Sequence, residues 1–105
     1  MDSGYDEKFL REAERYYRML VRKAPGIADS YAAYGEFCLG AYESPERALG
    51  LYRKALKKPT SNVQVLWTLG HRFKQLGEKE LQQAAEGYMS WLIEHLGIRD
   101  YFDGE

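Results

Sequence analysis

The sequence predicts an all-α protein made of tandem antiparallel helix pairs, with five helices stacked into an α-α superhelix. Three alanines recur at spacings of 35 and 36 residues, each with a tyrosine four residues later: Ala13 and Tyr17, Ala48 and Tyr52, and Ala84 and Tyr88. The dipeptide Tyr34-Gly35 is echoed by Leu69-Gly70, again 35 residues on. A period of this size is typical of arrays of helical hairpins, so the chain is expected to repeat one hairpin unit.

Length and composition indicate the class of protein. The 105 residues are expected to form a single domain, and 45% of them are hydrophobic and 30% charged, with three prolines. This balance is that of a folded helical protein rather than a disordered one. The net charge of −1 provides no general attraction to nucleic acid or to an anionic membrane. No signal peptide or membrane-spanning stretch is recognisable, so we expect a cytoplasmic protein without a membrane partner.

No residue pattern indicates catalysis. Cys38 is the single cysteine and lies at helical spacing in an apolar face, so a packed side chain is expected rather than a reactive thiol. Neither His71 nor His95 has a carboxylate, cysteine or second histidine at the spacing of a metal site. Glycine-rich phosphate loops, nucleophile elbows and HExxH motifs do not occur in the sequence. We therefore expect no enzyme activity, no metal and no cofactor.

The first helix is predicted from about residue 6 to residue 24, before Pro25-Gly26 ends it. Its apolar residues fall on one side and a stripe of cations falls on the other. Glu7 and Glu14 each stand four residues before an arginine, an order that favours ion pairs within a helix. We therefore expect the stripe to be an exposed, partly neutralised face. This basic stripe consists of Lys8, Arg11, Arg15, Arg18 and Arg22.

The next two helices form a predicted hairpin. The second helix is expected to be capped by Asp29 or a neighbour and to fade near residue 40. Ser44 is expected to cap the third helix, with Pro45 in its first turn. The third helix ends at residues 57–59, where two lysines near the last carbonyl groups are followed by a proline.

A second hairpin is predicted downstream. A capping box at residues 61–64 begins the fourth helix, and Gly77 follows its end. The fifth helix is predicted from Glu78 to Leu96. Because the last helix of an array has no successor to cover it, we expect one of two outcomes. Either residues 98–105 fold back onto the fifth helix, or that helix pairs with another molecule as a weak homo-oligomer.

These patterns resemble the tetratricopeptide repeat (TPR) family. The resemblance implies a half repeat at about residues 6–25, followed by repeats at about residues 28–59 and 61–97. In the first full repeat the family positions correspond to Tyr31, Tyr34, Gly35, Cys38, Ala48, Tyr52, Ala55 and Pro59. In the second they correspond to Leu66, Leu69, Gly70, Phe73 and Gly77 and, after a two-residue insertion, to Ala84 and Tyr88, with Trp91 in place of the last alanine. The resemblance implies a right-handed superhelix whose inner surface usually holds a peptide.

Two related repeat families share part of this pattern. Residues 31–37 and 47–56 are also similar to the half-a-TPR (HAT) repeats of RNA-processing scaffolds, although the second repeat lacks that pattern's second aromatic residue and its arginine. Pentatricopeptide repeats (PPR) share the period and read single-stranded RNA, but they are normally basic. A HAT-like or PPR-like repeat protein is therefore the alternative to a TPR protein.

The resemblance places the first helix of each pair on the concave surface. Side chains opposite the packing side of these helices then line a groove. Trp67 is the most informative of them, because a large aromatic side chain is rarely left to solvent. Two interpretations of Trp67 stay open: an anchor for a partner, or a side chain that packs across the groove. The predicted groove residues are Asp29, Ala32, Glu36, Gln64, Trp67, His71 and Lys74.

The expected function follows from this groove. We expect a non-catalytic protein-interaction module, an adaptor that binds a partner's peptide or helix. The alternative is an RNA-processing or RNA-binding repeat protein that uses the basic stripe. The near-neutral charge of the chain favours a protein partner over nucleic acid.

Overall fold

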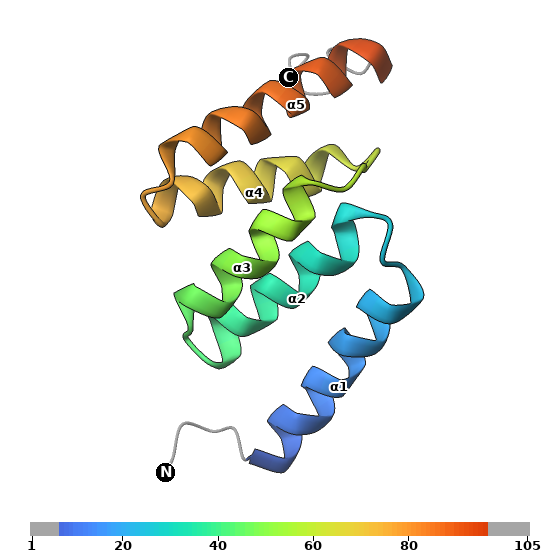
Figure 1. Cartoon of the computed structure of the whole chain (residues 1–105), viewed down its shortest axis with the longest axis vertical. Coiled ribbons are helices and arrows are strands. Elements are labelled where there is room, and N and C mark those ends of the chain that lie inside the picture. The colour runs from blue at the N-terminus through green and yellow to red at the C-terminus, as the bar shows by residue number, and fades with distance from the viewer. Residues whose placement is uncertain (1–6, 97–105) are drawn as a thin grey trace, which may run out of the picture. The chain divides into compact units, whose positions relative to one another are not determined.

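The computed structural model describes residues 7–96, and within that range the protein is all-helical, as the sequence predicts. Its elements are α1 (Glu7–Lys23), α2 (Ala28–Ala41), α3 (Pro45–Leu56), α4 (Val63–Gln75) and α5 (Lys79–Leu96) (Figure 1). The chain divides between Pro59 and Thr60 into two compact units. This division falls at the junction between the two predicted full repeats.

Helix α2 is the centre of the first unit, because it packs against both α1 and α3. Helices α2 and α3 run antiparallel as a hairpin (Figure 1). The hairpin is closely packed at Gly35, where a Cβ atom would lie 2.6 Å from Cε1 of the Tyr52 ring. Glycine is therefore required here because an aromatic ring occupies the space of a side chain. The residues of this hairpin that are completely buried are Ala28, Cys38, Ala48, Tyr52 and Ala55.

Local capping explains where these helices begin. The side chain of Ser44 accepts a hydrogen bond from the backbone N–H of Arg47, and Pro45 is the first residue of α3, as predicted. The cap predicted at Asp29 or a neighbour is not Asp29. Ile27 is the N-cap of α2 and makes no side-chain capping bond, whereas Asp29 lies within the first turn. A carboxylate at that place still interacts favourably with the positive end of the helix dipole.

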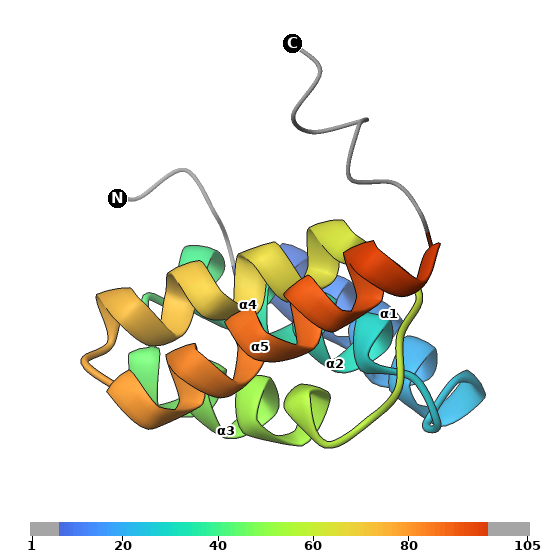
Figure 2. The same cartoon turned by 90° about the horizontal axis from the view of Figure 1, so that it is seen from above.

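The second unit is the hairpin of α4 and α5, which lie side by side and antiparallel (Figure 2). Asn62, rather than Ser61, caps α4 by accepting a hydrogen bond from the backbone N–H of Gln64 at 3.0 Å. Gly77 follows α4 with φ of +76°, the left-handed conformation that glycine adopts without strain. The hydroxyl of Tyr88 accepts from the backbone N–H of Thr60 at 3.1 Å and donates to its carbonyl at 3.2 Å. These bonds fasten the start of the second unit to α5.

The packing side of α5 differs by one residue from the predicted one. Ala84 is exposed, whereas Ala85 is completely buried and lies near Gly70 of α4. Further along α5, Leu92 is buried, and Trp91 is 54% exposed. The turn before α5 is therefore one residue longer, relative to the first hairpin, than the predicted alignment assumed. Ala85 and Leu92 occupy the places that Ala48 and Ala55 hold in α3, with the same spacing of seven residues.

Candidate partner-binding surfaces

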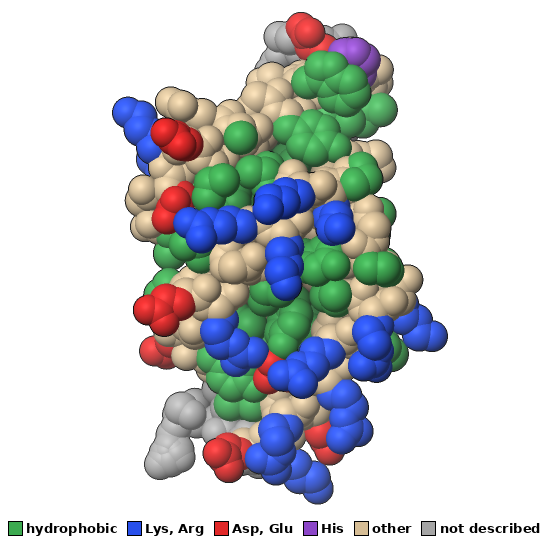
Figure 3. Space-filling view, viewed as in Figure 1, with side chains coloured by type: hydrophobic (Ala, Val, Ile, Leu, Met, Phe, Trp, Pro, Cys, Tyr) green, Lys and Arg blue, Asp and Glu red, His purple; other side chains and the backbone are tan. Residues whose placement is uncertain are grey.

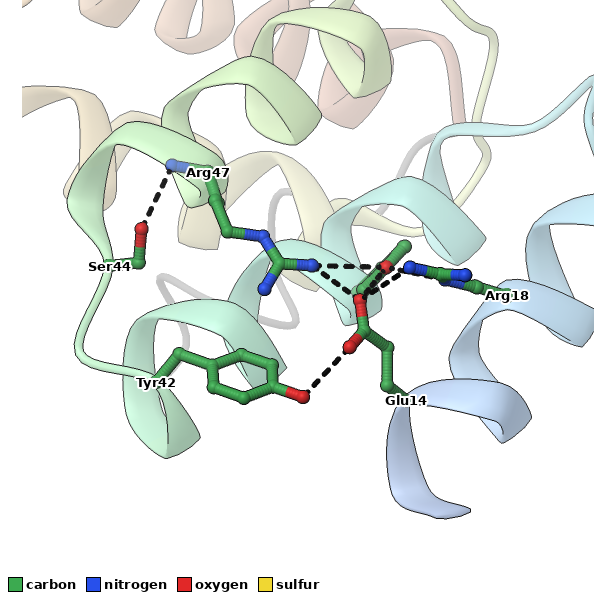
Figure 4. Close-up of polar contacts among 6 residues, drawn as sticks. Glu14, Arg18, Tyr42, Ser44 and Arg47 are labelled. Carbon is green, nitrogen blue, oxygen red and sulfur yellow. Dashed lines mark hydrogen bonds and ion pairs between the residues drawn. The ribbon is translucent and has the colours of Figure 1, made fainter. Parts of the chain in front are cut away.

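A cluster of polar side chains joins all three helices of the first unit around the carboxylate of Glu14 (Figure 4). Glu14 projects from α1 and is only 12% exposed. It accepts hydrogen bonds from the hydroxyl of Tyr34 in α2 and from the hydroxyl of Tyr42, at 2.8 Å, just after α2. The guanidinium of Arg47 in α3 also donates to it, and that of Arg18 lies 3.3 Å away.

These partners hold Glu14 in its charged form. Burial raises the pKa of a carboxyl group, but here the hydrogen bonds from Tyr34, Tyr42 and Arg47, together with the charge of Arg47, outweigh it. The result is a pKa lowered from 4.5 to about 2. Because α1, α2 and α3 all contribute to it, we interpret the Glu14 cluster as a structural joint between these helices.

Acid should weaken this joint. The folded-state pKa of Glu14 lies below its unfolded value of 4.5, so its contribution is complete above about pH 4.5 and is lost as the pH falls toward 2. We expect the loss to be about 2 kcal/mol, less than the whole pKa shift implies, because exposed arginines are screened by solvent and salt. The measurement is urea unfolding of the wild type and of Glu14→Gln from pH 6 to pH 2.5. The stability difference between the two proteins should shrink across this range, and a constant difference would contradict the assignment.

The basic stripe lies on an exposed face of α1, as expected. All five of its side chains are exposed, and lysine and arginine side chains gather over α1 in Figure 3. Both predicted ion pairs within the helix are present: Arg11 lies 3.7 Å from Glu7, and Arg18 lies 3.3 Å from Glu14. Arg18 also donates to the hydroxyl of Tyr34 and so belongs to the Glu14 cluster. Among the described residues, no carboxylate is ion-paired with Arg15 or Arg22.

The predicted groove residues of α2 differ in how much of each side chain is exposed to solvent. Ala32 is only 5% exposed, so it cannot offer a partner the accessible surface that the groove prediction requires. Asp29 and Glu36 are half-buried, and the carboxylate of Glu36 accepts a hydrogen bond from the hydroxyl of the buried Tyr52. Glu36 therefore helps to hold α3 against α2.

The predicted groove residues of α4 are all exposed. Trp67 is 52% exposed, and its ring stacks on that of His71 with centroids 5.0 Å apart and planes 9° apart. Gln64 and Lys74 are exposed on the same helix. About half of the Trp67 side chain is therefore exposed to solvent, and its ring is stacked on that of His71, one helical turn away.

Two adjoining pockets lie beside Trp67 in the second unit, with volumes of about 390 and 410 Å³. Trp67 and Met89 line both of them. The lining of the first pocket includes the polar side chains His71 and Lys74 of α4 and Glu86 of α5. The second is more apolar and includes Ile93. The α4 side of this surface was predicted, but its α5 side was not, because the resemblance placed only the first helix of each pair on the groove.

Other candidate groups are accounted for by packing. Cys38 is completely buried, and burial raises the pKa of its thiol, which makes it a poor nucleophile. On α5, His95 stacks on Trp91 with ring centroids 3.9 Å apart, and its Nδ1 lies 2.9 Å from the Trp91 carbonyl oxygen. Within residues 7–96 no three histidine, cysteine or acidic side chains gather as metal ligands would. None of the helices described is both long and apolar enough to cross a membrane.

Comparison with known proteins identifies no relative of this chain. No protein-family model matches the chain, and neither a curated protein nor a solved structure is significantly similar to it. The resemblance to tetratricopeptide repeats therefore stays a prediction from the sequence. What the structure shows is two helical hairpins, preceded by one further helix.

Proposed function

We propose that this protein is a protein-interaction module, which binds a segment of a partner on the exposed surface of the second unit around Trp67. The observation that carries the proposal is the combination of a half-exposed tryptophan with two adjoining pockets. Tryptophan is enriched among the residues that dominate binding energy at interfaces. Concave, largely apolar sites with a few polar groups are also the usual form of binding sites.

The chemistry of the surface indicates the kind of segment that it accepts. Met89 adapts to irregular apolar shapes, since its thioether side chain is unbranched and polarisable. His71 and Lys74 can donate hydrogen bonds on one side of the first pocket, and Glu86 accepts them on the other. A partner segment with an apolar anchor flanked by groups of both charges fits this arrangement.

Replacing Trp67 should abolish most of the binding without unfolding the protein. We expect Trp67→Ala to weaken partner binding by about 2 kcal/mol, roughly 30-fold, because it removes a large exposed contact. The measurement is affinity capture of proteins from a cell extract on the immobilised chain, quantified by mass spectrometry, alongside thermal unfolding. Trp91→Ala is the matched control: Trp91 is 54% exposed and also stacks on a histidine four residues later, but it borders neither of these pockets.

The result that would contradict the proposal is equally specific. Equal capture by the wild type and by Trp67→Ala would exclude this surface, and so would loss of the folded state in that variant. The RNA alternative is supported by the exposed stripe on α1 and predicts a different pattern. Binding would then fall steeply with salt and be lost in Arg15→Ala/Arg22→Ala, whereas Trp67→Ala would bind normally.

A further inference from the structure

In the first unit, α1 packs against α2, the helix that follows it in the chain. Two side chains of α1, three residues apart, contact α2. The ring of Tyr17 stacks on Phe37 with centroids 4.8 Å apart and on Tyr34 at 6.3 Å. Glu14 accepts a hydrogen bond from the hydroxyl of Tyr34. An acid and a large side chain on α1 thus bind an aromatic pair on α2, with a hydroxyl group donated to the acid.

Helix α5 carries the same arrangement of residues. Its buried residues Ala85 and Leu92 are seven apart, as are Ala13 and Leu20 in α1. Counting from the first alanine, α1 has its acid one residue later, its large side chain four residues later and a β-branched residue eight residues later. The corresponding residues of α5 are Glu86, Met89 and Ile93. The two helices therefore present the same kinds of side chain at the same spacings beside their alanines.

The difference between the two sets is what lies against them. In the first unit, the acid and the large side chain of the set on α1 contact α2. In the second unit Glu86, Met89 and Ile93 border the two pockets beside Trp67. Glu86 accepts from the side-chain amide of Gln82 at 2.9 Å, and among the described residues no lysine or arginine is ion-paired with it. The surface beside Trp67 could therefore accommodate a helix. The carboxylate of Glu86 on that surface can accept a hydrogen bond from it.

We propose that the α4–α5 surface binds an amphipathic helix of a protein partner, seated as α2 is seated on α1. The partner helix would place aromatic side chains three residues apart against Met89 and Trp67, and a tyrosine hydroxyl or a cation against Glu86. This inference rests on the proposed interaction function and specifies its partner segment. Charge complementarity selects the donor, because a carboxylate on a half-apolar surface strongly favours a hydrogen-bonded or cationic partner over an apolar one.

The test uses a peptide whose sequence already occupies such a seat. A synthetic peptide of residues 27–44, which carries the sequence of α2, is titrated into the isotope-labelled full chain and followed by NMR. This method detects millimolar affinity, and weak binding is expected because an isolated short helix is only marginally formed. We expect shifts of the Trp67 indole N–H and the Met89 methyl group, with affinity reduced at least fivefold in Glu86→Gln. Glu80→Gln, an exposed acid of the same helix, is the control and should bind normally.

A second peptide tests the hydroxyl contact itself. The peptide with Tyr34→Phe should bind the wild-type chain at least fivefold more weakly, and Glu86→Gln should then cause no further loss. Independent, additive losses would overturn the assigned contact. Shifts confined to α1 would mean that the peptide replaces α2 in its own unit, which also overturns the proposal.

The remaining outcomes separate this inference from the function on which it rests. If the peptide causes no shift at Trp67 or Met89 while capture of proteins still depends on Trp67, the helix seat is wrong and the interaction function stands. If capture does not depend on Trp67 either, both are wrong. If the peptide binds only after deletion of residues 97–105 or only on dilution, the chain itself or a second copy fills the surface, and a partner helix is overturned as its occupant.

Discussion

Gly35→Leu is expected to destabilise the protein by about 3 kcal/mol, a fall in the unfolding midpoint of roughly 15 °C. The physical reason is that a Cβ atom at Gly35 would lie 2.6 and 2.9 Å from two carbon atoms of the Tyr52 ring. That ring cannot easily move, because it is completely buried and its hydroxyl is hydrogen-bonded to Glu36. Helices α2 and α3 must therefore separate to admit a side chain.

Urea unfolding monitored by circular dichroism measures this effect, and the other glycines provide the controls. No atom lies within 4 Å of a Cβ built at Gly50 in α3, so Gly50→Ala should stabilise the helix by up to about 1 kcal/mol. At Gly70 the nearest atom, Cγ of Glu86, lies at an ordinary contact distance of 3.4 Å, so Gly70→Ala should have a smaller effect than Gly35→Leu. A Gly35→Leu protein as stable as the wild type would show that α2 and α3 do not pack in this way.

Glu14→Ala is expected to cost about 3 kcal/mol, because it leaves several donors without their shared acceptor. The hydroxyls of Tyr34 and Tyr42 and the guanidinium of Arg47 all point at this carboxylate. Removing it leaves a cation beside two hydroxyl groups that have lost the acceptor for their protons, at the junction of three helices. The expected result is a lower unfolding midpoint in urea, accompanied by faster amide exchange in α1.

Glu7→Ala is the matched control for Glu14→Ala. Glu7 also stands four residues before an arginine on α1, at 3.7 Å, but the side chains of this pair are 70% and 91% exposed. Exposed ion pairs of this kind contribute little to stability, so the midpoint of Glu7→Ala should be unchanged. If the two variants were equally stable, Glu14 would be an ordinary surface residue and the cluster would have no structural role.

The sequence predicted the helices well because their ends are coded locally. Ser44, Pro45 and Gly77 act within a few residues of where they stand, so turn chemistry alone located two of the junctions. The register of α5 was not coded locally in the same way. Ala84 and Ala85 both suit a helix, and the choice between them is made by packing against Gly70, which lies on another helix.

The candidate sites show the same division between local and distant information. The exposure of Trp67 follows from helical periodicity, so it was predictable. The Glu14 cluster was not, since Tyr34, Tyr42 and Arg47 lie 20, 28 and 33 residues further along the chain. A carboxylate next to an apolar stripe was the available signal, and only its ion pair with Arg18 was predicted from it. The predicted cover of α5 by residues 98–105 lies outside the residues that the structure describes.

The tie between Tyr88 and Thr60 has a consequence for proteolysis. Boundaries between compact units are usually where a protease enters, because the backbone there must open to fit an active site. Here the backbone is bonded on both sides of the boundary: the Pro59 carbonyl accepts from Ala28 at 3.0 Å, and both backbone groups of Thr60 bond to the Tyr88 hydroxyl. A protease that cuts between the two units must first break hydrogen bonds within each of them. The hydrogen bonds of Pro59 and Thr60 therefore protect the junction from cleavage.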